Sequence, residues 1–296
     1  MLPEALAPAS TRADADRVAR LALEEDGPRD LTTGVTGAGE EPTIAGIEYR
    51  SGGIVAGLDW AAAVARETGC GIRWAVADGD RVGAGAVIGT LEGSFAGVLR
   101  AERPLLNLLQ RACGIANATG AYVVAVAGTG CRILHTRKTA PGLRLLDIAA
   151  VLAGGGTLHR LDLSDIVMIK DNHWQALARS GVTLAEALVR GREQGAASCQ
   201  VEVESRGQVE AACAAGADRL LIDNQPPDAV REWGALARRL RPGIEIEATG
   251  GIDLSNVRAY AEAGVDFISI GALTHSVRAA DLGMEIVSGE KGAGSG

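Results

Sequence analysis

CRILHT (131–136) and DIVMIK (165–170) begin a series of short apolar segments that decides the fold of this chain. Four more follow, namely CQVEVE (199–204), RLLIDN (219–224), EIEATG (245–250) and FISIG (267–271). They begin 20 to 34 residues apart, with amphipathic stretches such as LAEALVRGREQG between them, which is typical of repeated strand–helix units. Nearly continuous Ile, Leu and Val indicate parallel strands buried on both faces. We therefore expect an α/β fold with a parallel α/β barrel of six or seven strands; a doubly wound open sheet is the alternative.

The sequence before these segments has a different pattern. An amphipathic helix is expected over 14–25, and alternating stretches between Thr43 and Leu91 indicate antiparallel hairpins with a helix at 59–68 between them. A long helix over 102–127 leads into the first apolar segment. We therefore expect an α+β domain over 1–115 and a barrel domain over 116–275. We also expect a segment 276–288 that packs on the first domain and a disordered tail over 289–296.

Composition argues against several classes of protein. The 296 residues are 47% apolar and 22% charged, as in a globular chain. A net charge of −8 and only four Trp, three Tyr and two Phe argue against nucleic-acid binding. Five Cys without a CxxC pair indicate a reducing compartment, and no apolar run reaches the ~18 residues of a membrane span. We expect a cytoplasmic protein without membrane contact, in which a local basic cluster holds any anionic ligand.

Charged residues directly follow or end most of the expected strands. They are Arg137, Lys138, Lys170, Asp171, Glu202 and Asp223. Because parallel barrels build active sites at the carboxyl ends of their strands, we expect these side chains to converge on one rim. His159 and Arg160, after the glycines at 154–156, join the same rim. Arginine suits planar anions and lysine suits phosphate, so this cluster predicts a ligand with more than one anionic group.

The acidic and glycine-rich strand ends leave several interpretations open. Glu202 and Asp223 either form salt bridges with these bases or bind ribose hydroxyls or a divalent metal. ATGG (248–251) and IG (270–271) lie where many barrels bind phosphate. The four His lack close ligand spacing, which argues against zinc. A Schiff base on Lys138 or Lys170 is an alternative, although the dense neighbouring charge fits ion binding better.

Seven motifs, in order, resemble those of the quinolinate phosphoribosyltransferase family. They are ERPLLNLLQRACGIAN (102–117), TRKTAPGLRLL (136–146), GGGTLHRLDLSDIVMIKDNH (154–173), VEVE (201–204), LIDN (221–224), EATGG (247–251) and ISIGALTHS (268–276). The resemblance implies an N-terminal open sandwich and a C-terminal α/β barrel. It also implies a homodimer, or a higher assembly, in which one subunit's N-terminal domain covers the other's barrel mouth.

The family joins quinolinate to phosphoribosyl pyrophosphate in the presence of Mg²⁺. The products are nicotinate mononucleotide, pyrophosphate and CO₂, and the reaction belongs to NAD biosynthesis. By resemblance, the two pyridine carboxylates would be bound by the partner subunit's Arg103 and by Arg137, His159 and Arg160. The 5′-phosphate would be bound by Thr249, Gly250 and Gly271.

The resemblance also implies the catalytic residues. Lys138 and Lys170 would contact the pyrophosphate and the ribose phosphate. Glu202 and Asp223 would contact the ribose hydroxyls and hold Mg²⁺.

The chain departs from the family pattern at several positions. Leu158 stands where Asn is usual, Ile148 and Ala149 stand where Lys-Tyr is usual, and His135 stands where Asp is commoner. Two alternatives therefore stay open. The chain is either a paralogue that acts on another pyridine carboxylate, or a non-catalytic relative that binds an oxyanion, like the family's molybdenum-transport-associated branch. The presence of Lys138 and Lys170 favours an enzyme.

Overall fold

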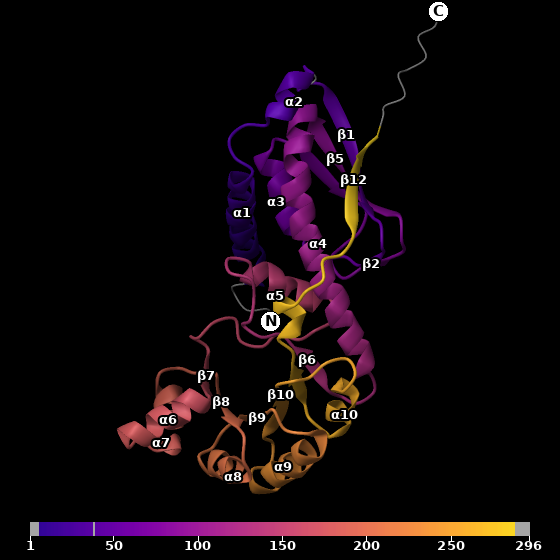
Figure 1. Ribbon diagram of the computed structural model, residues 1–296. Coiled ribbons are helices and arrows are strands. Elements are labelled where there is room, and N and C mark those ends of the chain that lie inside the picture. Colours follow the sequence, from indigo (N-terminus) through magenta and orange to yellow (C-terminus); the bar gives the residue numbers. More distant parts are fainter. Residues whose placement is uncertain (1–5, 38, 288–296) are drawn as a thin grey trace, which may run out of the picture. The chain divides into compact units, whose positions relative to one another are not determined.

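Figure 1 shows the computed structural model of this chain, which describes residues 6–37 and 39–287. Contacts divide the chain into two compact units. Within the described residues, unit 1 contains the chain up to Gly120, Thr139–Gly155 and the residues from Thr274 on. Unit 2 contains Ala121–Lys138 and Gly156–Leu273. The tail expected at 289–296 lies outside the described residues.

Unit 1 is an α+β structure built on an antiparallel sheet. The sheet order is β12-β1-β5-β3, with bounds Leu282–Ile286, Pro42–Tyr49, Ala86–Ser94 and Gly71–Trp74. A second sheet pairs β2 (Gly53–Ile54) with β4 (Arg81–Val82). The helices are α1 (Pro8–Glu25), α2 (Leu31–Thr36), α3 (Leu58–Glu67), α4 (Phe95–Ala125) and α5 (Arg144–Ala153). The prediction of an α+β unit with antiparallel strands is confirmed, but the pairs join strands that are not consecutive in the chain, such as β1 with β5 and β2 with β4, and so differ from the expected hairpins.

Strand β1 illustrates how alternation in the sequence sets this sheet. Ala45, Ile47 and Tyr49 are fully buried, and the residues between them are more exposed. Because a shift of one residue would turn these side chains to the other face, burial fixes the register of the strand. β12 pairs antiparallel with β1, with Tyr49 opposite Leu282. The last strand of the described chain therefore completes the sheet of unit 1.

Unit 2 contains a parallel sheet in which each of the six quoted segments forms a strand. The strands are β6 (Arg132–Leu134), β7 (Ile166–Ile169), β8 (Ser198–Val203), β9 (Arg219–Asp223), β10 (Glu245–Thr249) and β11 (Phe267–Ser269). The helices are α6 (Asp171–Ser180), α7 (Leu184–Glu193), α8 (Arg206–Ala214), α9 (Pro227–Leu240), α10 (Val257–Glu262) and α11 (Ala272–His275). Figure 1 shows strands alternating with helices along this part of the chain.

The strand order distinguishes a barrel from a doubly wound sheet. The order is β6-β11-β10-β9-β8-β7, so each strand from β7 to β11 lies beside the next one in the sequence, and β6 lies beside β11. A doubly wound sheet would instead reverse its order at a switch point. The backbone N–H of Thr157 donates to Ile133 at 2.7 Å, and Thr157 forms a parallel bridge with Leu134 at the free edge of β6. The arrangement is consistent with the expected α/β barrel.

Helix α4 is the longest helix, at 31 residues. It carries Arg100, Glu102 and Arg103 in its first third, and such charges are costly in a bilayer. In the ranges 6–37 and 39–287, no helix is both long and apolar enough to cross a membrane.

A buried ion pair stabilises the segment Thr139–Gly155, which the sequence analysis placed in the barrel domain and which contacts group with unit 1. Asp147 of α5 is fully buried, and its two carboxylate oxygens each accept a hydrogen bond from Arg111 of α4 at 2.8 Å. The same carboxylate accepts from the backbone N–H of Ala140 at 3.0 Å. Arg111 also donates to the carbonyl of Thr274 at 3.0 Å. One bidentate pair thus joins three separate segments of unit 1.

We expect Asp147→Ala to lower the free energy of unfolding by about 3–5 kcal/mol, because it leaves the Arg111 guanidinium without its carboxylate. Urea denaturation measures the change. The matched control is Asp228→Ala, whose carboxylate is 94% exposed and pairs with Arg231 at 3.0 Å, and which should cost under about 1 kcal/mol. Equal losses in the two variants would contradict the role assigned to the buried pair.

Candidate active site

A cavity of about 610 Å³ in unit 2 gathers most of the residues that the sequence analysis singled out. It is lined by the side chains or backbone of Arg137, Lys138, His159, Arg160, Lys170, Glu202, Asp223, Thr249 and Gly250. Lys170 follows β7, Glu202 lies near the end of β8, and Asp223 ends β9. Parallel pairing places these carboxyl ends side by side, so the convergence follows from the topology.

Two predicted site residues do not line this cavity. Gly271 follows β11 in unit 2, two residues beyond Ser269, which does line it. Arg103 lies in α4 of unit 1, and its side chain is 59% exposed. Its nearest carboxylate in the described part of the chain is that of Glu102, at 3.8 Å. The roles of Arg103 and Gly271 stay predictions.

Lys170 and Glu202 form an ion pair at the cavity floor. The Glu202 side chain is only 9% exposed, whereas that of Lys170 is 40% exposed, and both residues line the cavity. The indole N–H of Trp174 donates to the backbone carbonyl of Glu202 at 2.9 Å, and the backbone N–H of Lys170 donates to His173 Nδ1 at 3.0 Å. Helix α6 thereby fixes both members of the pair.

Asp223 supplies a second carboxylate beside Glu202. Its pKa is raised, first by burial and then by the negative charge of Glu202; a 2.7 Å hydrogen bond from Asn224 and the charge of Lys170 oppose the shift. Two oxygen donors under mutual repulsion are suited to a hard cation such as Mg²⁺, which takes one or two carboxylates together with phosphate oxygens. No cluster of three or more His, Cys, Asp or Glu side chains suited to a metal occurs in the described residues.

The turn after β10 requires glycine. Gly250 and Gly251 have φ of 84° and 61°, in the region that other residues rarely adopt. A Cβ on Gly250 would also overlap the Asn224 side chain and lie 2.8 Å from Asp223 Oδ1. The backbone of this turn thus closely approaches the acidic end of β9.

The guanidinium groups of Arg137 and Arg160 repel each other within the cavity. The pKa of Arg160 is lowered, first by burial and then by the positive charge of Arg137, while Glu247 opposes the shift. The buried Nε of Arg137 has no hydrogen-bond partner among the described residues. A bound anion would relieve both the repulsion and the unmet hydrogen bond. This part of the cavity is therefore suited to a carboxylate or phosphate.

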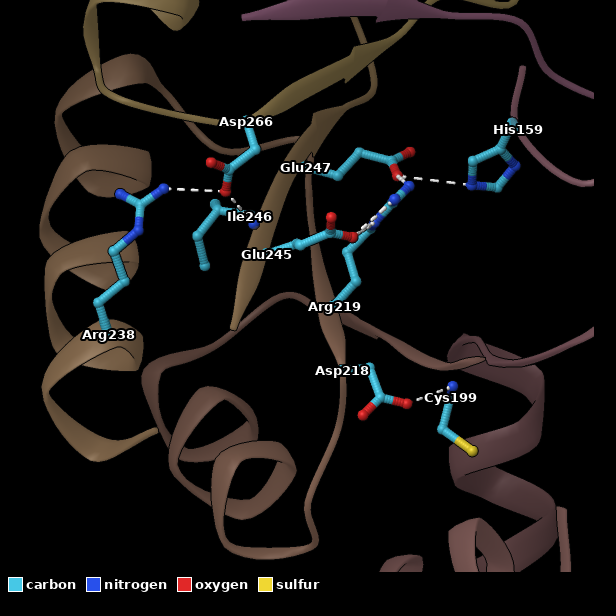
Figure 2. Close-up of polar contacts among 9 residues, drawn as sticks. All are labelled: His159, Cys199, Asp218, Arg219, Arg238, Glu245, Ile246, Glu247 and Asp266. Carbon is cyan, nitrogen blue, oxygen red and sulfur yellow. Dashed lines mark hydrogen bonds and ion pairs between the residues drawn. The ribbon is translucent and has the colours of Figure 1, made fainter. Parts of the chain in front are cut away.

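A charged network at the cavity wall joins the predicted His159 to Glu247 and Arg219, two residues that the sequence analysis missed (Figure 2). Glu247 of β10 is 1% exposed and lies between Arg219, whose Nη1 is 3.2 Å from Glu247 Oε2, and His159, whose Nε2 is 3.5 Å from the same oxygen. The guanidinium of Arg219 lies 3.9 Å from the centre of the Phe267 ring. The sequence signal that could have identified Glu247 was the alternation of Glu245, Glu247 and Thr249, because alternate residues of a strand lie on one face and can place charge inside a barrel.

Family models match nearly the whole chain. The model described as "Quinolinate phosphoribosyl transferase, N-terminal domain" matches residues 30–113, and the one for the C-terminal domain matches 115–285.

Known relatives also match this chain over most of its length. The chain is 39% identical to a nicotinate-nucleotide pyrophosphorylase [carboxylating] of Mycobacterium leprae, over 90% of this chain and 95% of the relative. It is 40% identical to a probable enzyme of that name from Bacillus subtilis, over 89% and 90% of the two chains. With the human enzyme of that name it shares 34% identity over 90% of each chain.

A solved structure agrees with these matches. The nicotinate-nucleotide pyrophosphorylase of Francisella tularensis superposes with a TM-score of 0.86 at 33% identity, over 93% of this chain and 97% of the other. This likeness confirms the expected fold class. The motifs, the family models and the relatives agree, and the chain belongs to the quinolinate phosphoribosyltransferase family.

Proposed function

We propose that this protein transfers the phosphoribosyl group of phosphoribosyl pyrophosphate to quinolinate and removes one carboxylate as CO₂. The products are nicotinate mononucleotide and pyrophosphate, for NAD biosynthesis. Family membership supports the reaction. The observation that carries it is the division of one cavity into two charged regions. Arg137 and Arg160 repel each other in one of them, and Glu202 and Asp223 do so in the other.

The basic region suits the pyridine dicarboxylate. Arg137 and Arg160 present planar forks that each bind a carboxylate through two hydrogen bonds, and His159 adds a ring nitrogen. Two such contacts fix the orientation of the flat ring without aromatic stacking. Orientation of the ring nitrogen toward the ribose carbon is a large part of the rate enhancement of such a reaction.

The acidic region suits the ribose. When pyrophosphate departs, the ribosyl carbon gains positive character, and Glu202 and Asp223 stabilise that charge from fixed positions. Lys138 and Lys170 attract the departing pyrophosphate. The glycine turn at Gly250, with Thr249 and Gly271, offers backbone N–H groups for the 5′-phosphate.

The residues present fit a Mg²⁺ cofactor held by Glu202 and Asp223, together with phosphate oxygens of the substrate. When bound, the ion adds positive charge that neutralises the leaving pyrophosphate.

Decarboxylation needs no protein nucleophile. The pyridine nitrogen uses its lone pair to bond the ribosyl carbon and becomes positively charged. The ring then accepts the electron pair of the adjacent carbon–carboxylate bond as CO₂ leaves, and that ring carbon takes up a proton. The chain's contribution is to hold the remaining carboxylate through Arg137 or Arg160 while this occurs.

The substrate is tested by incubating the protein with phosphoribosyl pyrophosphate, Mg²⁺ and a panel of pyridine acids, with release of pyrophosphate and CO₂ as the readout. Release of both with quinolinate supports the proposal. Release with a different pyridine acid only would assign the chain to a paralogue whose preference reflects Leu158. No release with any acid would indicate a non-catalytic anion binder, and a borohydride-trapped adduct on lysine would indicate Schiff-base chemistry.

Arg137→Ala and Arg160→Ala should each lower kcat/KM for quinolinate by about 30-fold or more, because a charged hydrogen-bonded pair with substrate is lost. Steady-state kinetics at subsaturating quinolinate measure this. The control is Arg190→Ala, an exposed arginine of α7, which should leave kcat/KM unchanged. Near-normal kcat/KM in both cavity variants would overturn the assignment of the two arginines.

We further propose a cytoplasmic homodimer, or a higher assembly, in which Arg103 of the partner subunit completes each site. The Arg103 side chain is 59% exposed and forms only a long contact, at 3.8 Å, with the carboxylate of its neighbour Glu102, which favours a role outside its own unit.

Arg103→Ala and Lys170→Ala proteins should each be inactive, yet mixing them with subunit exchange should restore about one quarter of the wild-type activity. Half of the dimers are then mixed, and one of the two sites in each mixed dimer is intact. Activity after mixing, compared with the two separate proteins, provides the measurement. If mixing restores nothing although exchange is demonstrated, Arg103 does not act across subunits.

A further inference from the structure

His159 is held by its ring and by its backbone. Its Nε2 lies 3.5 Å from Glu247 Oε2, a long contact, and no group in the described residues makes a shorter hydrogen bond to this nitrogen. Its backbone N–H donates to Nε2 of the fully buried His135 at 3.0 Å. Both side chains of the His159–Glu247 pair are more than nine-tenths buried. The environment therefore restricts the rotation of the ring.

The carboxylate that faces His159 is itself anchored. Arg219 Nη1 lies 3.2 Å from Glu247 Oε2, while its Nε and Nη2 donate to Glu245 at 2.9 and 2.7 Å. Burial alone would raise the pKa of Glu247, but the hydrogen bond and charge of His159 and the charge of Arg219 outweigh it and hold the pKa below its usual value. With the guanidinium of Arg219 3.2 Å away, Glu247 faces His159 as a carboxylate acceptor.

An ionised carboxylate accepts hydrogen bonds but cannot donate one. Since the Glu247 carboxylate faces Nε2 at 3.5 Å, and Nε2 has no closer hydrogen-bond partner in the described residues, a neutral His159 ring is expected to carry its proton on Nε2. Figure 2 shows the Nε2 edge of the ring turned toward Glu247 and the other ring nitrogen turned away from it. That second nitrogen, Nδ1, is an acceptor until the ring takes up another proton.

Basic side chains lie near His159. His135 lies edge-on to His159 with ring centres 6.3 Å apart, and Arg160 is the next residue in the chain. Arg137 lies close enough to Arg160 to lower its pKa. From β9, the positive charge of Arg219 acts from behind Glu247. Glu247 is the one negative group in contact with the ring among the described residues, so it compensates the charge of an imidazolium.

We propose that Glu247 is a positioning residue, which directs His159 Nδ1 to the substrate and allows the ring to carry two protons when a substrate carboxylate binds. In the bound state Nε2–H faces Glu247 and Nδ1–H donates to the carboxylate. The inference rests on the function proposed above, and its mechanism is that of a buried carboxylate that orients a histidine and stabilises its charged form. Arg219 keeps Glu247 in place.

Glu247→Gln preserves the size of the side chain and removes its charge. We expect the KM for quinolinate to rise roughly tenfold at pH 8 and less at pH 6, with little change in kcat, since the loss is that of one charge-assisted hydrogen bond to substrate. The matched control is Glu245→Gln, which alters the other carboxylate on Arg219 but does not reach His159; its KM should stay within about twofold of wild type at both pH values. An increase in KM that is the same at both pH values, or equal in the two variants, would overturn the inference. Thermal denaturation of both variants verifies that they fold.

A double-mutant cycle tests whether Glu247 acts through His159. In a His159→Gln background, Glu247→Gln should change KM by less than about twofold, because the residue that it orients is absent. The same loss in both backgrounds would show that Glu247 acts by another route.

Histidine ¹⁵N NMR provides a readout that does not depend on turnover. The chain has only four His, so His159→Gln identifies the His159 signals. Without ligand, wild type should show the proton of the neutral ring on Nε2, and Glu247→Gln should show a mixture of tautomers. A proton on Nδ1 in wild type, or identical spectra for the two proteins, would refute the inference. If wild type lacks transferase activity, the proposed function fails while this measurement still decides the role of Glu247.

Discussion

Burial of Glu247 inside the parallel sheet of unit 2 is the constraint on which the candidate site depends. A carboxylate that is 1% exposed must be compensated where it lies, because removal from water costs several kcal/mol per ion. Arg219 and His159 supply that compensation from β9 and from the loop before β7. The strand register therefore fixes the position of a charged pair, His159 and Glu247, both of which line the cavity.

Like-charged side chains also lie near each other in two regions of the cavity. Arg137 and Arg160 repel one another, and Glu202 and Asp223 do likewise, so each region is better satisfied by a ligand of opposite charge than by itself. Lys170 forms an ion pair with Glu202 of the acidic region, and its side chain remains 40% exposed. The carboxylates of a pyridine dicarboxylate fit the basic region, and a ribose carbon that gains positive character fits the acidic one. An apolar or singly charged molecule would leave one of the two regions uncompensated.

Particular residues show which parts of this account follow from sequence. The strands and the rim were predictable because apolar runs of fixed spacing end in Lys170, Glu202 and Asp223, and parallel topology places such ends together. The pairing of Arg111 with Asp147 was not predictable, because the two residues are 36 positions apart and local sequence patterns do not relate residues at that separation. For the same reason Thr139–Gly155 groups with unit 1 and not with the strands on either side of it. Glu247 was overlooked because a glutamate in a strand usually faces solvent, and only the barrel's interior makes it significant.

The ratio of CO₂ to pyrophosphate tests whether the cavity couples phosphoribosyl transfer to decarboxylation. In one reaction containing quinolinate, phosphoribosyl pyrophosphate and Mg²⁺, we expect the two products to appear in equal amounts and at the same rate, with nicotinate mononucleotide as the third product. Pyrophosphate without CO₂, or neither product, would contradict the claim that this cavity couples phosphoribosyl transfer to decarboxylation.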